Sequence, residues 1–526
     1  MPQRMRLNEG NRKWWTLAAM CFALFMIMLD NTVVNVALPS IQEDLDASIS
    51  SLEWTINAYT LTFAVLLVTG GRLGDILGRR RMFLFGVVVF AVSSAAIGLA
   101  PSQGWLVAGR AVQGIGGAFM MPGTLSIISN TFPPQERGRA IGTWAGVSAL
   151  ALAAGPVVGG ALTEYVSWRA IFFLNLPVAA GAVIVTLFAA RESRDPTVDR
   201  RVDYPGIAAL SVGLTALVLA LVEGNRWGSA EIGALLATAA VALVAFVVVE
   251  RRGRAPMLQF EYFRSRSFLG ASGVAFIVSF AMLAMFFFMA LYMQNILGYS
   301  PLEAGVRFLP STVVIIFAAP IAGRLADRIG PRPLIVTGMS LVAVALFLQT
   351  RVTETTGYAE LLPAFIVMGF GMGLTMSPMS TAAMNAVSAH KAGAASGILS
   401  MFRMVGGTFG IAASGALFQS LARTRIDERL AGLHLPDSVR SELADGVGSG
   451  AGAGPLHGVD PQASAQVTSA LHDGFIHALS GALTLSCGVA IAGALIALTL
   501  IEPKRKLRRS VDQVRQPEAV EPLGVS

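Results

Sequence analysis

The fold is decided by a ten-residue stretch that occurs twice, as Gly71-Arg-Leu-Gly-Asp75-Ile-Leu-Gly78-Arg-Arg80 and as Gly323-Arg-Leu-Ala-Asp327-Arg-Ile-Gly330-Pro-Arg332. Matching small residues follow each copy. The two sets of matches keep their order and nearly the same offset, 252 and then 255 residues. This agreement predicts that the chain arose by duplication of one structural unit. The second set aligns Gly138, Ala140, Gly142 and Gly155 with Gly393, Ala395, Gly397 and Gly410.

Apolar segments surround both copies and extend over most of the chain. Of the 526 residues, 54% are hydrophobic and 13% are charged, and the charged share is roughly half that of a soluble domain. Fourteen segments have about the 20 apolar residues that a helix needs to cross a membrane. They are continuous rather than alternating, which excludes a closed β-barrel. Their approximate limits are 14–36, 52–70, 82–101, 105–129, 138–162, 169–190, 204–222, 229–249, 268–292, 303–323, 333–350, 360–384, 394–420 and 475–501.

The duplication pairs the second to fifth segments with the tenth to thirteenth. We therefore expect an all-α integral membrane protein with two six-helix halves, 14–190 and 268–501, and an inserted pair of helices at 204–249. An even insertion keeps both halves in the same orientation, as in transporters that bind substrate between their halves. The long outer loop 421–474 is expected to continue the preceding helix to about residue 432 and then to be disordered.

The placement of charge predicts the orientation of the chain. Most Lys and Arg residues lie in loops and tails on one side of the predicted arrangement. By the positive-inside rule that side is the cytoplasm, so the terminal segments 1–13 and 502–526 are both cytoplasmic. The net charge of +7 therefore does not indicate nucleic acid. The basic stretch 504–509 predicts contact with anionic membrane lipid. An excess of Arg over Lys hints at a GC-rich genome, hence a bacterial cell (inner) membrane.

The repeated stretch falls between the second and third segments, on the cytoplasmic side. Its glycines permit a tight turn and a close approach of helices. Its aspartate and arginines can pair with each other or with helix ends. Such contacts form in one conformation and break in another, as a gate requires, although ordinary loop charge is the alternative. The gate is expected to consist of Gly71, Asp75, Gly78, Arg79 and Arg80 and, from the second copy, Asp327.

Asp30 and Arg110 lie inside apolar segments, where a charge costs about 3 kcal/mol on insertion scales. Asp30 is either a polar kink residue near a water-filled cavity or a carboxylate that alternates between protonated and charged forms. Arg110 is either structural, bonded to backbone carbonyls, or a fixed positive charge that tunes Asp30, because a guanidinium does not deprotonate. The second half has Leu362 or Phe365 at the matching position. We therefore expect proton coupling in the N-terminal half.

Two further groups of residues have both a functional and a structural interpretation. A small-residue seam is either generic helix packing or a hinge and seal that favours exchange over uniport; it consists of Gly146, Gly155, Pro156, Gly159 and Gly160. A set of polar residues either faces a substrate cavity or makes bonds between helices; it consists of Asn35, Asn57, Tyr59, Gln113, Asn175 and Arg403. Arg403 is either structural, or snorkels towards the membrane surface, or balances a phosphate or carboxylate.

These motifs resemble those of the major facilitator superfamily. The stretch 71–80 is similar to its signature between helices 2 and 3, Arg110 to Gly117 to its fourth-helix motif with a buried arginine tied to proton coupling, and 155–160 to its fifth-helix antiporter motif. Leu29 to Pro39 and Trp168 to Pro177 resemble signatures of the fourteen-helix drug:proton antiporters of the EmrB/QacA type. The resemblance implies a proton-driven antiporter that exports lipophilic, cationic drugs by alternating access.

Other functions remain open at this point. The same machinery serves a dedicated exporter of one metabolite, lipid or self-made antibiotic. A non-transporting membrane receptor is a further alternative, and import by symport is disfavoured by the Gly-Pro seam. The chain has no phosphate-binding loop and no metal-ligand spacing, so we expect no cofactor, no metal and no enzyme activity. We expect a monomer, with a periplasmic adaptor as partner if the cell has an outer membrane.

Overall fold

The computed structural model describes residues 9–45, 49–195, 203–222, 228–252, 261–388, 391–430 and 461–503, and all regular elements in these ranges are helices. Fourteen spans within them are long and apolar enough to cross a membrane, which confirms the predicted architecture. The N-terminal half contains α1 (Glu9–Leu45), α2 (Ile49–Leu77), α3 (Arg79–Gly98), α4 (Gln103–Thr131), α5 (Pro134–Tyr165), α6 (Arg169–Phe173) and α7 (Asn175–Ala189), of which α6 and α7 form one span.

The inserted pair consists of α8 (Tyr204–Val222) and α9 (Ser229–Arg252), and the short helix α10 (Glu261–Arg264) follows it. The C-terminal half contains α11 (Arg266–Asn295), α12 (Pro301–Arg307), α13 (Leu309–Ile329), α14 (Pro331–Gln349), α15 (Tyr358–Asn385), α16 (Ala392–Leu430) and α18 (Pro461–Leu500).

Local sequence explains where several of these helices begin. Ser102 and Ser265 accept hydrogen bonds from the backbone N–H groups of Trp105 and Phe268, and Ser300 forms a capping box. Such caps satisfy backbone donors that a helix leaves unpaired in its first turn. Between the caps the apolar runs are helical because hydrocarbon offers no partner for a free backbone N–H or carbonyl group.

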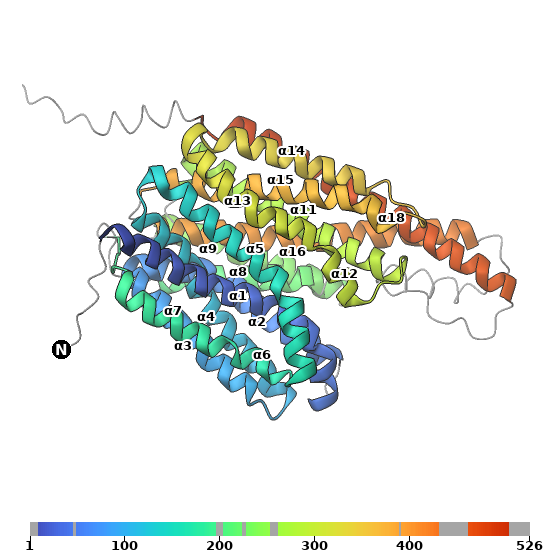
Figure 1. Ribbon diagram of the computed structural model, residues 1–526, viewed down its shortest axis with the longest axis horizontal. Coiled ribbons are helices and arrows are strands. Elements are labelled where there is room, and N and C mark those ends of the chain that lie inside the picture. Colours follow the sequence, from blue (N-terminus) through green and yellow to red (C-terminus); the bar gives the residue numbers. More distant parts are fainter. Residues whose placement is uncertain are drawn as a thin grey trace, which may run out of the picture.

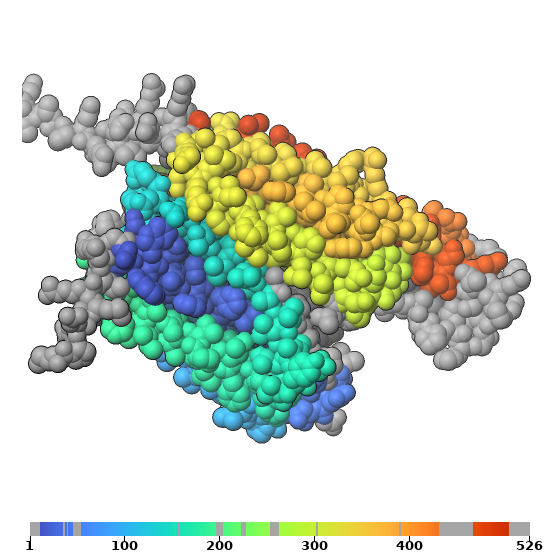
Figure 2. All heavy atoms as spheres, viewed as in Figure 1, coloured from blue at the N-terminus to red at the C-terminus, as the bar shows by residue number. Residues whose placement is uncertain are grey.

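The two halves form two bundles that meet along a seam, blue to teal on one side and yellow to orange on the other (Figures 1 and 2). α5 crosses α13 at this seam, and α2 crosses α16. The inserted helix α8 contacts both α2 and α16, and α9 packs on α8. The inserted pair therefore lies outside the two bundles, at the position where they meet.

The segment 421–474 differs from its predicted disorder. α16 continues to Leu430, close to the expected residue 432, but α18 already begins at Pro461, so 461–474 is helical and the prediction was wrong there. Arg425 and Arg429 donate hydrogen bonds from Nε to Asp473 Oδ2 at 2.8 and 2.9 Å. These bonds join the ends of α16 and α18, which extend beyond the other helices (Figure 1). Residues 431–460 and the basic stretch 504–509 lie outside the described residues.

Near the end of α1, Asp44 attaches this helix to α6. Its carboxylate accepts hydrogen bonds from Arg169 and from Trp168 Nε1, and these bonds lower the pKa of Asp44. A carboxyl group whose pKa is lowered by folding stabilises the protein above its ordinary pKa, and this contribution disappears as the pH falls through the lowered value. Because the side chain is 45% exposed, solvent screening keeps the contribution small.

We therefore expect Asp44→Asn to lower the melting temperature by about 1 °C at neutral pH, and the difference from the wild type to shrink on acidification. Thermal unfolding of the detergent-solubilised protein between about pH 6 and pH 3 measures both values. A difference that grows on acidification would contradict this account.

Candidate functional site

Asp30 lies in α1 with 2% of its surface exposed and accepts hydrogen bonds from three side chains. Arg110 Nη1 donates to Asp30 Oδ2 at 2.6 Å. Gln113 Nε2 and Asn175 Nδ2 donate to Asp30 Oδ1 at 2.9 and 3.1 Å. The structure thus brings together four of the residues that the sequence singled out, from α1, α4 and α7. We call this group, with Ser94, the Asp30 network.

The arginine of this network is held on several sides. Arg110 and Gln113 are three residues apart, which places them on one face of α4, and Arg110 Nη1 also donates to Gln113 Oε1 at 2.6 Å. Arg110 Nε donates to the backbone carbonyl of Thr55 at 3.1 Å. The guanidinium lies over the ring of Tyr59, with Cζ 4.3 Å from the ring centroid. Arg110 is therefore both bonded to a carbonyl and paired with Asp30, so the two interpretations of it describe one geometry.

Sequence reasoning missed Ser94 and the carbonyl of Thr55. Ser94 is fully buried in α3, and its Oγ accepts hydrogen bonds from Gln113 and Asn175 at 2.7 and 3.1 Å. A serine within an apolar helix is common, because its hydroxyl usually bonds to the backbone of its own helix. Nothing in the sequence therefore separates Ser94 from other serines, and a backbone carbonyl has no sequence signal at all.

In this arrangement Asp30 acts only as a hydrogen-bond acceptor. Arg110, Gln113 and Asn175 all donate to its carboxyl oxygens, and an ionised carboxylate can accept all three bonds because it has acceptors only. A proton added to Asp30 would cancel its negative charge and so weaken the charge-assisted bond from Arg110. We therefore expect the Asp30 network to have a second, more weakly held arrangement in which Asp30 carries a proton.

The small-residue seam of α5 has two faces. Gly155 lies against Thr32, and a Cβ atom at Gly159 would come within 2.7 Å of Val33 Cγ1, so both glycines pack on α1 two or three residues after Asp30. Gly146 lies on the other side, where a Cβ atom would be 3.1 Å from the carbonyl of Ile316 on α13. Nine residues are two and a half helical turns, which explains the opposite directions of Gly146 and Gly155. Gly160 is partly exposed, and the side chain of Pro156 is not among those that the structure describes.

We expect Gly155→Ala to reduce transport by at least about tenfold, because its methyl group would displace Thr32 and with it the turn of α1 that contains Asp30. Gly181→Ala is the matched control, because a Cβ atom there has no neighbour within 4 Å. Initial transport rates at equal protein levels measure both. Equal rates for the two variants would show that the contact between α5 and α1 has no role in transport.

The repeated stretch forms a contact between the halves. Asp75, fully buried at the end of α2, accepts hydrogen bonds from the backbone N–H groups of Gly393 and Ala394 at 3.0 and 2.7 Å. It also pairs with Arg79, whose Nε and Nη2 are 2.9 and 2.6 Å from Oδ1. Gly393 and Ala394 open α16, so Asp75 caps a helix of the other half, where a negative charge is stabilised.

The second copy makes the reciprocal contact. Asp327 accepts hydrogen bonds from the backbone N–H groups of Gly138 and Arg139 in α5 at 3.0 and 3.1 Å. Arg137 Nη1 donates to Asn385 Oδ1 at 2.8 Å across the same seam. Each aspartate therefore bonds to a helix of the opposite half, Asp75 at the start of α16 and Asp327 within the first two turns of α5. We call the end of the molecule that contains them the motif end.

A third segment closes over the first copy. Gly78 has φ 117°, and a Cβ atom there would meet the Glu192 carboxylate at 2.8 Å. Glu192 accepts hydrogen bonds from the backbone N–H groups of Arg80 and Arg81 at 3.0 and 3.2 Å. Arg80 Nη1 donates to the carbonyl of Ala190 at 3.1 Å. The chain after α7 thus fixes the turn between α2 and α3.

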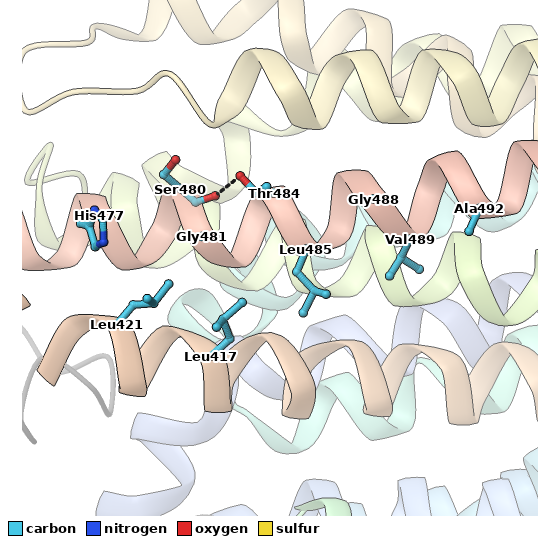
Figure 3. Close-up of a pocket in the computed structure, with 10 residues that line it drawn as sticks. All are labelled: Leu417, Leu421, His477, Ser480, Gly481, Thr484, Leu485, Gly488, Val489 and Ala492. Carbon is cyan, nitrogen blue, oxygen red and sulfur yellow. Dashed lines mark hydrogen bonds between the residues drawn. The ribbon is translucent and has the colours of Figure 1, made fainter. Parts of the chain in front are cut away.

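The other predicted cavity residues are not part of the Asp30 network. Asn57 is partly exposed on α2, and the side chain of Asn35 is not among the described ones. Arg403 is partly exposed on α16. A separate cavity of about 720 Å³ lies between α16 and α18 (Figure 3). Its lining is mainly apolar, with His477 at one end, and it includes no residue of the network.

A helical fold that crosses the membrane fourteen times, with a buried charge pair and two reciprocal contacts between its halves, defines a multi-pass membrane transporter. The model of the Major Facilitator Superfamily matches residues 20–411, and the chain belongs to this superfamily, in its fourteen-helix drug:proton antiporter family. The proton:xylose symporter XylE superposes with a TM-score of 0.60 at 12% identity, covering 96% of this chain and all of that one, which shows the fold alone.

Two relatives are similar over most of their length. The tetracenomycin C resistance and export protein of Streptomyces glaucescens is 35% identical over 494 residues, which are 93% of this chain and 91% of that protein. The multidrug resistance protein Stp of Mycobacterium tuberculosis is 36% identical over 431 residues, which are 81% and 80% of the two chains. The first is named for a single antibiotic and the second for multidrug resistance.

Proposed function

We propose that the protein is a proton-driven efflux transporter that exports lipophilic drugs by alternating access. The observation that carries this proposal is the buried pair of Asp30 and Arg110, 2.6 Å apart between α1 and α4. A carboxylate in an apolar span is a site for a transported proton, and the resistance and export proteins among the relatives support drugs as the cargo. A cationic drug would compete with the proton at Asp30, so the predicted cationic cargo stays part of this proposal.

The mechanism follows from the two arrangements of the Asp30 network. A proton that arrives on Asp30 releases part of the hold on Arg110 and Asn175. Because Gly155 and Gly159 pack on the next turn of α1, this change is transmitted to α5. At Gly146, α5 contacts α13 of the other half and transmits the change across the seam. Loss of the proton restores the Asp30 network and returns the contact between α5 and α13 to its first state. Each cycle thus exchanges protons for drug.

The motif end is the proposed cytoplasmic gate. The basic loops and both termini are assigned to this side by the positive-inside rule, in a bacterial cell (inner) membrane. The halves 14–190 and 268–501 rock against each other, while the pair 204–249 remains beside the seam. The contacts of Asp75 and Asp327 form when the cytoplasmic end is closed and break when it opens. We propose a monomer as the transporting unit, with an adaptor only in cells that have an outer membrane.

The test of this function is ethidium transport in inverted membrane vesicles. We expect vesicles that contain the protein to accumulate ethidium once a proton gradient forms, and to lose it when an uncoupler is added. Vesicles from cells without the protein are the control. Accumulation that persists with the uncoupler would contradict proton coupling.

The second candidate function is dedicated export of a single antibiotic, which the name of the Streptomyces glaucescens relative favours. A panel of unrelated lipophilic drugs in the same vesicles separates the two. Transport of one compound alone, with the protein folded and present, would support the dedicated exporter.

A further inference from the structure

Arg403 is a charge within the spans that the Asp30 network does not explain. It lies in α16, within the candidate span Ala392–Leu430. Arg110 has Asp30 as its partner, whereas no described residue makes a hydrogen bond, an ion pair or a ring contact with Arg403. A charge at such depth is costly without a counter-charge or water. About 16 Å of helix separates Arg403 from the start of α16, which is farther than an arginine side chain extends.

The direction of Arg403 follows from its own helix. Ser396 Oγ donates a hydrogen bond to the carbonyl of Pro122 on α4, so this face of α16 meets the N-terminal half. Arg403 follows Ser396 by seven residues, which is two turns and nearly the same face. Gly410, seven residues further on, packs on Phe280 of α11. Arg403 therefore lies where this face of α16 passes from the N-terminal half to α11, about 10 Å farther from the motif end than Ser396.

The two halves are less tightly joined at that level. Pro122 and Ser396 are buried where they meet. Ile115 precedes Pro122 by seven residues on α4, which runs in the opposite direction to α16, and both Ile115 and Arg403 are partly exposed. The same faces of the same two helices are thus closed near the motif end and accessible two turns away. Arg403 is therefore less enclosed than the contact between Pro122 and Ser396.

We propose that Arg403 is a subsite for an acidic group of the cargo, a carboxylate or an ionised phenol. This inference rests on the proposed drug export and names a substrate class for it. A guanidinium offers paired donors that match a carboxylate, and such a bond is stronger in an apolar span than in water. At the matching position of the first half the duplicated fold has Ser148. The positive subsite is therefore specific to the C-terminal half, whereas the carboxylate of Asp30 belongs to the N-terminal half.

The test compares a rhodamine methyl ester with the corresponding rhodamine free acid, which differ only in the acidic group. Wild-type protein in inverted vesicles is expected to transport the acid, and Arg403→Gln is expected to lower the ratio of acid to ester transport by about tenfold. Arg403→Lys keeps the charge and should restore part of this ratio. Arg351→Gln removes an exposed arginine outside the spans and should leave the ratio unchanged.

Three results of the transport assay would overturn the inference. The first is an Arg403→Gln variant with the wild-type ratio, and the second is equal loss of both probes, which indicates a structural role. The third is wild-type transport of the ester without the acid, which leaves drug export standing. If neither probe is transported, fluorescence polarisation measures the binding of each probe to the purified protein instead. Tighter binding of the acid that Arg403→Gln removes would support the subsite while drug export fails, and equal binding of both probes would overturn both.

Discussion

Replacing Asp30 by Asn is expected to abolish proton-driven transport, with the initial rate of ethidium accumulation falling on the order of a hundredfold. Asn keeps the size of the side chain and still accepts from Gln113 or Asn175, but it neither takes up a proton nor balances Arg110. Loss of one partner of a buried ion pair costs roughly 3–5 kcal/mol because the other charge stays uncompensated. Both effects act on the same step, the exchange of a proton at the network.

The matched control for Asp30→Asn is Glu43→Gln. Glu43 is an exposed carboxylate on the same helix α1, so its replacement removes one negative charge without touching the Asp30 network. We expect it to transport at the wild-type rate. Size-exclusion chromatography of both variants verifies that they are folded. If folded Asp30→Asn transports at the wild-type rate, the coupling carboxylate is a residue other than Asp30.

The second large effect is expected at the gate. Asp75→Asn places an amide where the N–H groups of Gly393 and Ala394 require two acceptor oxygens, and it removes the negative charge at the start of α16. The closed motif end is then destabilised, and the cycle loses one of its two states. We expect transport to fall by at least about tenfold, since buried hydrogen bonds to a charged group contribute roughly 1.5–3 kcal/mol.

Accessibility of the seam provides an independent measure of this gate. Ser400 is 7% exposed and lies farther along α16 than the closed contact. The variant Ser400→Cys, in a background with Cys21→Ser and Cys487→Ser, provides a single thiol there. Asp75→Asn should increase its reaction rate with a thiol reagent applied from the motif end by several-fold. Glu136→Gln is the control, because Glu136 pairs with Lys13 within the N-terminal half. Unchanged labelling and unchanged transport in Asp75→Asn would refute the gate.

The architecture was readable from the sequence because membrane spans are long and apolar and because the gate motif occurs twice. The early start of α18 at Pro461 was not predicted, since its first turns lie outside the apolar core and contain Asp473, which bonds to Arg425 and Arg429 of α16. Counting apolar residues detects only the part of a helix that lies in the hydrocarbon. The helix itself can extend farther when its charged side chains pair with those of a neighbouring helix. The hydrogen bonds from Arg425 and Arg429 to Asp473 provide this pairing, and no local sequence pattern predicts them.

The candidate site was predictable where the chemistry is unusual. Asp30 and Arg110 stand out because charges are rare in spans, and their pairing is the simplest way to lower the cost. The capping of α16 by Asp75 was only partly readable, because a motif suggests a helix end without saying which helix. The opposite directions of Gly146 and Gly155 follow from their spacing, but their partners on α13 and α1 depend on how the bundles pack.

The most direct test of the account measures proton movement caused by drug movement. Proteoliposomes are loaded with ethidium and a lumenal pH dye, at equal pH on both sides, and diluted into drug-free buffer. Proton-coupled exchange predicts that the lumen acidifies as ethidium leaves through the wild-type protein, and that Asp30→Asn shows neither event above the protein-free background. Ethidium efflux through the wild-type protein without acidification of the lumen would contradict antiport.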